Sequence, residues 1–191
     1  MIEHKTTLKR KGFSLLEVLL SVFVMSVGLM TIVAVINGSL AFSYDTRDNI
    51  IATELAQEGV ELVRNVRDND FAAGNDGFTD FNGNEHCRID WDDAVTSLDC
   101  NGGRGAQSRY YLQYSGGMYA HVNLTEERYS RLIYIEYRNN GAPPVKRALV
   151  RSFVVWGNFT TETGDIPANG DPTRCQNSPT CVYTETFLTS W

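Results

Sequence analysis

A long apolar segment near the N-terminus constrains this chain more than any other feature. Residues 13–36 contain no Lys, Arg or Asp and only one acidic residue, Glu17. As an α-helix the segment is about 36 Å long, at about 1.5 Å per residue. That length is enough to cross a hydrocarbon layer of about 30 Å. The sequence therefore predicts a transmembrane helix with a single carboxylate close to its start.

Charged residues are distributed unevenly on the two sides of this segment. Four basic residues and one acidic residue precede Gly12, whereas 13 basic and 21 acidic residues follow Asn37. Basic residues beside a transmembrane helix favour the cytoplasmic side. We therefore expect a single-pass protein of the cytoplasmic (inner) membrane, in contact with lipid, with its N-terminus inside and its C-terminal part outside. The acidic C-terminal part argues against a nucleic-acid partner, which requires a basic surface.

Two simpler interpretations of the apolar segment stay open. A cleaved secretory signal would end at a small-x-small site such as Ser39-Leu40-Ala41. The apolar core of such signals usually spans about 7 to 15 residues, which is shorter than this segment. A plain signal anchor for an unrelated domain would need nothing beyond the apolar length.

The apolar pattern becomes periodic after residue 37. Small or apolar residues recur three and four positions apart, as on one face of a helix: Ile51, Leu55, Gly59, Leu62 and Val66. Asp68-Asn69-Asp70 and the Gly-containing segment 73–77 then favour a break. We predict one helix from Phe13 to about Asn69, with a transmembrane first part (13–36) and an amphipathic second part (37–69).

Residues 70–191 have the pattern of a globular domain built on an antiparallel sheet. Segments rich in β-branched and aromatic residues alternate with connections rich in Gly and Asn. Strands are expected at 108–114, 118–123, 131–138, 148–156 and 183–191. Gly116-Gly117, between the first two, predicts a tight hairpin. The expected fold class is α+β: a long N-terminal helix, an irregular connection, and a meander of strands on which the amphipathic part of the helix packs.

The four cysteines all follow the apolar segment, on the side expected to be outside. They are Cys87, Cys100, Cys175 and Cys181. An even number of cysteines in an oxidising compartment favours disulfides. Proximity in sequence suggests the pairs Cys87–Cys100 and Cys175–Cys181, one of three possible connectivities. A zinc site is the alternative, but no C-x-x-C pair is present and only three histidines are available;.

No catalytic motif stands out. The chain contains no G-x-S-x-G, no Gly-rich phosphate loop and no His-x-x-x-His;. His4 lies before the membrane segment and His86 adjoins a cysteine, while His121, in a predicted strand, fits a structural or exposed role better than a catalytic one. We expect no enzyme and no cofactor.

Oxygen-bearing side chains are concentrated between residues 75 and 93. Clustered oxygen ligands suit Ca²⁺, and Asp80-Phe81-Asn82-Gly83-Asn84 starts like an EF-hand loop. The Gly is displaced, however, and Trp91 occupies the twelfth position in place of Glu. We expect a solvated acidic loop without a metal, with calcium as the alternative.

Glu17 has a structural explanation within its own helix. Ser14 and Glu17 have the spacing of a capping box, and a carboxylate in the first turn meets the positive end of the helix dipole. This explanation does not account for the surrounding pattern, in which a basic leader, Gly12, an aromatic residue and Glu17 precede an unbroken apolar helix.

Segment 11–19 (KGFSLLEVL) resembles the N-terminus of type IV prepilins and of the pseudopilins of type II secretion. Segment 55–65 is similar to helices of minor pilins, and the Trp-containing segments 154–157 and 187–191 are similar in a less specific way. The closely matching motifs cover about a third of the chain.

The resemblance implies a subunit that is processed and then assembled. Prepilin peptidase, a membrane aspartyl protease, would remove the leader, residues 1–12, by cutting between Gly12 and Phe13, and would methylate the new Phe13 amine. Glu17 would then pair with the Phe13 ammonium of a neighbouring subunit. The implied partners are other pilin subunits, the peptidase and an inner-membrane assembly platform, and the final location is an extracellular or periplasmic filament.

The subunit type and the kind of filament are less constrained. Major pilins usually have a Pro that kinks this helix, but residues 13–36 contain none. The resemblance therefore favours a minor pilin or pseudopilin, in a pilus, a secretion pseudopilus or a DNA-uptake filament. The alternative function is a membrane-anchored extracytoplasmic binding module that does not polymerise.

Overall fold

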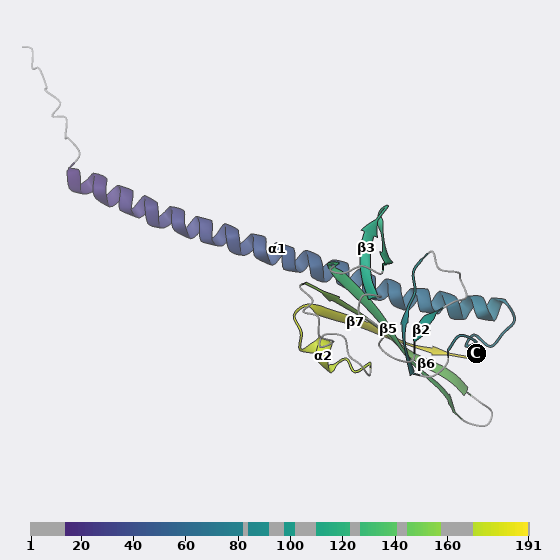
Figure 1. The fold of residues 1–191 in the computed structure, drawn as a ribbon. Helices are drawn as coiled ribbons and strands as arrows, with labels where there is room; N and C mark the ends of the chain where they lie inside the picture. The colour runs from purple at the N-terminus through teal and green to yellow at the C-terminus, as the bar shows by residue number, and fades with distance from the viewer. Residues whose placement is uncertain are drawn as a thin grey trace, which may run out of the picture. The chain divides into compact units, whose positions relative to one another are not determined.

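The computed structural model describes residues 14–81, 84–91, 98–101, 110–122, 127–140, 145–157 and 170–190 (Figure 1). The chain divides into two compact units, residues 1–46 and residues 47–191. One helix, α1 (Leu15–Ala72), contributes its first part to the first unit and its second part to the second. This long helix and a C-terminal antiparallel sheet confirm the predicted α+β class.

In the first unit, α1 has no buried side chain from its start to Thr46. The helix begins at Leu15 because the carbonyl of Ser14 accepts hydrogen bonds from the backbone N–H groups of Glu17 (2.9 Å) and Val18 (3.3 Å). Ser14 is therefore the N-cap residue. Phe13, the expected first residue of the helix, lies outside the described residues.

In the second unit, α1 buries Leu55, Gly59 and Val66 of the predicted stripe, while Ile51 and Leu62 are half-buried. Its small or apolar buried residues are Ala52, Leu55, Ala56, Gly59, Val60, Val63 and Val66. The helix ends at Ala72, three residues beyond the predicted end at Asn69. Gly74 has a φ of 86° and Gly77 one of 80°. Gly74, which lies directly after the last helical turn, rather than the Asp-Asn-Asp run, marks the end of the helix, and Gly77 lies in the turn that follows;.

Seven strands form one antiparallel sheet in the described part of the second unit. They are β1 (Asn84–Arg88), β2 (Asp99–Asn101), β3 (Tyr111–Ser115), β4 (Met118–His121), β5 (Tyr129–Asn140), β6 (Val145–Trp156) and β7 (Cys181–Thr189). The central strand is β5, which pairs with β6 along its whole length. The other edge of β5 is shared by β1 and β3. The sheet then continues from β1 to β2, from β3 to β4 and from β6 to β7.

This topology confirms part of the predicted strand order and corrects the rest. The hairpin at Gly116-Gly117 joins β3 to β4, with Ser115 paired to Met118. The meander prediction holds only for β5, β6 and β7. It was wrong before β5, because β3 rather than β4 lies next to β5. The strands β1 and β2 and the short helix α2 (Thr173–Gln176) were not predicted.

Both faces of the sheet are covered in its central part. On the face toward α1, residues of the helix stripe pack with side chains such as Ile133, Val150 and Leu188. On the opposite face, Phe153 and Val155 pack with Cys175 of α2 and with Cys181. This double coverage explains why β6 is buried without interruption from residue 152 to residue 156;.

The backbone of α1 lies close to the sheet at Gly59. A Cβ atom at this position would lie 2.4 Å from Ser152 Oγ and 3.2 Å from Ser152 Cβ on β6. It would also lie 3.1 Å from Cδ of Arg131 on β5. Only glycine leaves room for the helix backbone to approach the sheet this closely.

We predict that Gly59→Ala destabilises the second unit by about 1 to 3 kcal/mol, since overpacking a filled core costs that much. Replacing Ser152 by Ala in the same chain should recover part of the loss, because it removes the nearest atom. Thermal unfolding of the detergent-solubilised chain measures both effects. The matched control is Gly38→Ala on the same helix, where nothing lies within 4 Å. Equal loss in both Gly→Ala variants, or no loss at Gly59, would contradict the packing argument.

Candidate functional site

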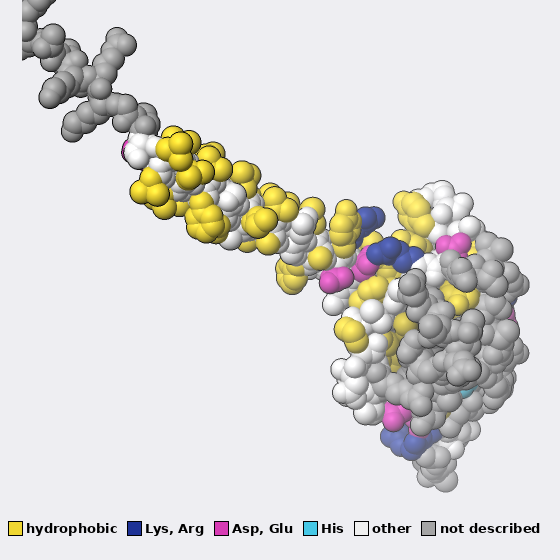
Figure 2. Space-filling model, turned by 60° about the vertical axis from the view of Figure 1, so that its left-hand side comes forward, with side chains coloured by type: hydrophobic (Ala, Val, Ile, Leu, Met, Phe, Trp, Pro, Cys, Tyr) yellow, Lys and Arg dark blue, Asp and Glu magenta, His cyan; other side chains and the backbone are white. Residues whose placement is uncertain are grey.

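The first unit exposes an apolar helix surface that is continuous along α1. Large hydrophobic side chains are more than 45% exposed at most positions from Leu15 to Ile36, and they cover the visible face of this part of the helix in Figure 2. An exposed apolar patch of this extent marks contact with a membrane or with other proteins. By length and composition, α1 is the one helix among the described residues that could cross a membrane.

Glu17 lies in the first turn of this apolar helix. Its side chain is exposed, and the four backbone N–H groups that open a helix give this end a partial positive charge;. The carboxylate is therefore tolerated in its own helix and remains open to a partner. The other predicted processing residues, Gly12 and Phe13, lie outside the described residues, so the structure does not place them relative to Glu17.

The cysteines are joined as the two pairs that proximity in sequence suggested. Cys87 on β1 lies directly opposite Cys100 on β2, and a disulfide connects them. A second disulfide connects Cys175 of α2 to Cys181 at the start of β7. Bridges that close loops of this size contribute about 2 to 4 kcal/mol each in the chain-entropy picture. They fasten the two short elements, β2 and α2, to the main sheet.

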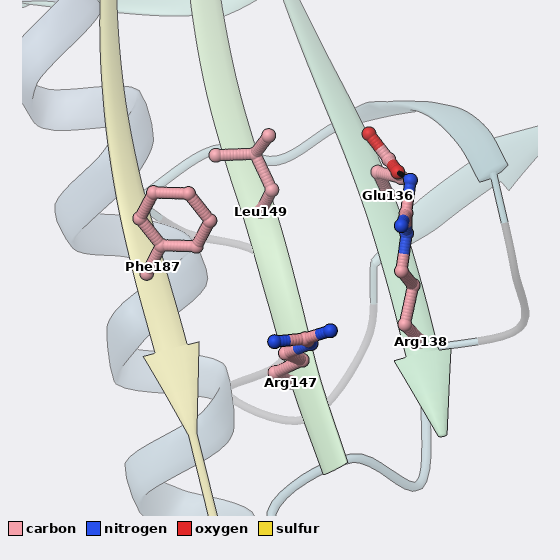
Figure 3. A pocket seen from close by; sticks show the side chains of 5 residues that line it. All are labelled: Glu136, Arg138, Arg147, Leu149 and Phe187. Atoms are coloured by element: carbon pink, nitrogen blue, oxygen red, sulfur yellow. Dashed lines mark hydrogen bonds and ion pairs between the residues drawn. The ribbon is translucent and has the colours of Figure 1, made fainter. Parts of the chain in front are cut away.

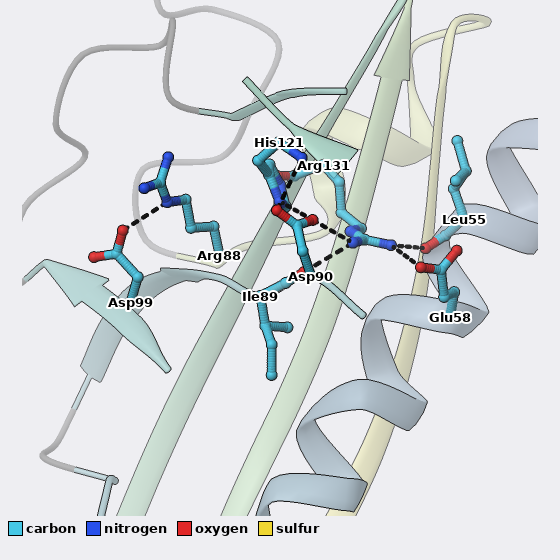
Figure 4. A network of polar contacts seen from close by, with 8 residues as sticks. All are labelled: Leu55, Glu58, Arg88, Ile89, Asp90, Asp99, His121 and Arg131. Carbon is cyan, nitrogen blue, oxygen red and sulfur yellow. Dashed lines mark hydrogen bonds and ion pairs between the residues drawn. The ribbon is translucent and has the colours of Figure 1, made fainter. Parts of the chain in front are cut away.

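A buried arginine connects three segments of the second unit. The side chain of Arg131, on β5, is fully buried between α1 and the sheet (Figure 4). Its guanidinium donates to the carbonyl of Leu55 (3.4 Å) and to the carbonyl of Ile89 (2.9 Å). It also lies 3.2 Å from a carboxylate oxygen of Glu58 and 3.4 Å from one of Asp90. Two carboxylates and two carbonyls thus compensate the buried charge.

His121 extends this network to β4. Its Nδ1 lies 2.6 Å from Oδ1 of Asp90, and its Nε2 lies 3.1 Å from the carbonyl oxygen of Arg131. Both neighbours are hydrogen-bond acceptors, so Asp90 and the Arg131 carbonyl hold the ring from its two sides;. The backbone N–H of His121 also donates to Asp90, at 2.9 Å.

A second polar cluster ties the start of β5 to α1. Asp48 is buried on α1 and accepts hydrogen bonds from Arg128 and from the hydroxyl of Tyr129 (2.9 Å). The hydrogen bond from Arg128 lowers the pKa of Asp48, and it outweighs burial, which acts in the opposite direction. For Tyr129, burial and then the hydrogen bond to Asp48 raise the pKa to about 12.

Sequence reasoning missed Arg131, Asp90 and Asp48. One signal was available: Arg131 is a charged residue that alternates with Ile133 and Ile135 on the face of a strand expected to be apolar. His121 was given a structural or exposed role, and its ring is in fact buried. In the acidic 75–93 loop, Asp76 pairs with Lys146 and Asp90 with the network. Within the described residues no three His, Cys, Asp or Glu side chains are grouped as metal ligands would be.

Comparison with known proteins identifies the N-terminal segment. Residues 7–33 match the prokaryotic N-terminal methylation motif. No curated protein and no solved structure matches the chain. The chain thus carries a type IV prepilin-like leader followed by a long apolar helix, within an α+β, pilin-like architecture. The motif supports a type IV pilin-like substrate of prepilin peptidase, and together with the apolar helix it points to a membrane-anchored structural subunit.

We predict that the network around Arg131 is lost in acid. Burial raises the pKa of Asp90, but the hydrogen bonds and charge of His121 and the charge of Arg131 outweigh it, so that pKa lies below its ordinary value of 3.8. The stability that the ionised carboxylate contributes is therefore present above about pH 4 and falls as the pH drops through the lowered pKa. In urea unfolding between pH 6 and pH 2, the free energy of unfolding should fall less steeply with decreasing pH for Asp90→Asn than for the wild type. The difference in slope should be up to about 1.4 kcal/mol per pH unit.

Asp80 provides the control for this titration. Burial and the nearby charge of Asp70 raise the pKa of Asp80, so its contribution to the acid decline has the opposite sign. Asp80→Asn should therefore leave the decline as steep as in the wild type or make it steeper. If the free energy of unfolding of Asp90→Asn falls with pH as steeply as that of the wild type, the role given to Asp90 is contradicted.

Proposed function

We propose that this chain is a minor pilin or pseudopilin, a structural subunit of a type IV pilus-like or type II secretion filament. The observation that carries the proposal is the methylation motif at residues 7–33, followed by an apolar helix with no buried side chain through Thr46. In this proposal residues 1–12 are the leader, 13–36 the membrane and assembly segment, 37–69 the amphipathic helix and 70–191 the globular domain.

Processing follows from the chemistry at the junction. Prepilin peptidase would cleave between Gly12 and Phe13 and methylate the Phe13 amine. Glycine offers no side chain that would obstruct the protease at the scissile bond. The released N-terminus is a cation at the start of an apolar helix, and it would need a counter-ion when the helix is surrounded by lipid or by other helices.

Glu17 of a neighbouring subunit would supply that counter-ion. The carboxylate lies in the first turn and is exposed. In a medium of low dielectric constant an ion pair is strongly favoured over two isolated charges. Pairing of Phe13 with Glu17 between subunits would set the axial register of adjacent helices, because each charge occupies one defined height in the apolar segment.

The remaining partners follow from the same topology. The N-terminus would face the cytoplasm, and the second unit would lie outside the inner membrane before it enters an extracellular or periplasmic filament. Other pilin subunits and an assembly platform in the inner membrane would be its contacts. The absence of Pro between residues 13 and 36 and the two disulfides support a minor rather than a major subunit.

The variant Glu17→Gln separates assembly from capping. Gln also serves in a capping box, so the helix and the cleavage site, which lies upstream, should be preserved. The Phe13 ammonium would lose its counter-ion, and removing one partner of a buried pair costs about 3 to 5 kcal/mol. We therefore predict a processed, membrane-resident chain whose recovery in sheared filaments falls more than tenfold, measured as the ratio of filament to membrane fractions.

The matched control is Glu54→Gln, which removes an exposed carboxylate elsewhere on the same helix and should leave filament recovery unchanged. Equal filament recovery for Glu17→Gln and the wild type would remove the assembly role of Glu17. If the wild-type chain itself stays in the membrane fraction in cells that assemble filaments, it is a membrane-anchored binding module rather than a filament subunit.

A further inference from the structure

The face of the sheet that points away from α1 has an open hollow near one end of β5, β6 and β7. It measures about 280 Å³ and is lined by Glu136, Arg138, Arg147, Leu149 and Phe187. Figure 3 shows these five side chains on one face of the three strands, with the helix on the other. The hollow therefore belongs to the second unit alone and uses none of the residues assigned to processing or assembly.

The charges in this hollow are not balanced. Arg138 on β5 and Arg147 on β6 are directly opposite each other in the strand register, an arrangement in which like charges destabilise the sheet. Glu136 pairs with Arg138. Among the cations of β5, β6 and β7 whose side chains the structure describes, Arg147 is the one without a carboxylate partner: Arg131, Arg138, Lys146 and Arg151 each have one.

An exposed aromatic ring lies beside the unpaired arginine. Phe187 is 68% exposed, and it is paired across the strands with Leu149, two residues along β6 from Arg147. Arginine and aromatic residues are the types that most often dominate the binding energy at protein interfaces. The hollow thus offers an anion site and an apolar surface side by side.

We propose that this hollow is a docking site for a segment of a different protein, which presents a carboxylate to Arg147 and an adjacent apolar side chain to Phe187 and Leu149. The carboxylate would give Arg147 the acidic partner that Arg138 already has in Glu136. It would form the bidentate hydrogen bonds that a guanidinium favours. The proposal concerns a sheet face and stands independently of the helix-mediated assembly described above.

Two other kinds of occupant fit the charges less well. Nucleic acid and anionic membranes extend well beyond the hollow, and the part of the chain after Asn37 has 21 acidic against 13 basic residues, which would repel them within the screening length of about 8 Å;. A second copy docked about a two-fold axis through this site would place Arg147 against Arg147. A single carboxylate on a partner protein meets the basic site without either repulsion.

Site-specific photo-crosslinking in the full chain tests the proposal. Thr189 is exposed and lies opposite Arg147 in the register of β6 and β7, so a benzoylphenylalanine at this position reports on the hollow without replacing a residue that lines it. The chain would be expressed in its native cells, irradiated, and the crosslinked peptide sequenced. We expect an adduct with another protein, at a peptide that has Asp or Glu next to an apolar residue.

Charge variants identify the contact. Arg147→Glu should reduce the adduct at least tenfold, whereas Arg147→Lys should retain most of it. Arg147→Glu also places a carboxylate directly opposite Arg138 in the strand register. The melting temperature of this variant should therefore equal or exceed that of the parent chain. Loss of the adduct therefore does not reflect loss of the fold. Arg47→Glu, at an exposed cation of α1, makes the same change in net charge and should leave the adduct unchanged.

Several results would overturn the proposal. These are the absence of an adduct, an adduct that is unaffected by Arg147→Glu, a crosslinked peptide without an acidic residue, and crosslinking to lipid, to nucleic acid or to a second copy of this chain.

Discussion

The second unit depends on the burial of one positive charge, that of Arg131, between α1 and the sheet. An isolated charge in this position would be strongly unfavourable. It is stable because α1 contributes the Leu55 carbonyl and Glu58, while the segment after β1 contributes the Ile89 carbonyl and Asp90. His121 then fixes Asp90 from β4. A single side chain on β5 thus contacts both the helix and the segment after β1, and through Asp90 and His121 it is linked to the β3–β4 hairpin.

The arginine and the close helix–sheet contact are parts of one arrangement. Gly59 lies one residue after Glu58, and its missing side chain lets α1 approach Ser152. That approach brings the helix carbonyl at Leu55 and the carboxylate at Glu58 within reach of the guanidinium. Two further polar contacts lie on either side of this site along α1. Asp48 accepts hydrogen bonds from Arg128 and Tyr129, and Arg64 donates to Thr186. The amphipathic part of the helix is therefore held by specific contacts as well as by its apolar stripe.

The sequence predicted the features that depend on a local pattern of residues. The apolar length of residues 13–36, the helical stripe from Ile51 to Val66 and the Gly-Gly hairpin each follow from a local pattern. The short strands β1 and β2 could not be predicted in this way, because they lie within a polar segment. The strand β1 is held by pairing with β5, and β2 is held by pairing with β1 and by the Cys87–Cys100 bridge. Likewise, the position of β3 beside β5 depends on long-range pairing. The Arg131 network joins residues that are up to 76 positions apart, so no local pattern reveals which carboxylates meet which arginine. For the candidate site, the leader pattern was predictable because it lies in a single short segment.

Processing and assembly both depend on whether the N-terminal segment is a prepilin leader. The most direct measurement is the mass of the N-terminal peptide of the mature chain isolated from the cell envelope. We expect a chain that begins at Phe13, with an N-terminal peptide that is heavier than the unmodified one by the mass of one methyl group on its α-amine. A chain that begins at Phe42, after the Ser39-Leu40-Ala41 site, or one that retains Met1 and the leader in cells with an active prepilin peptidase, would contradict this expectation.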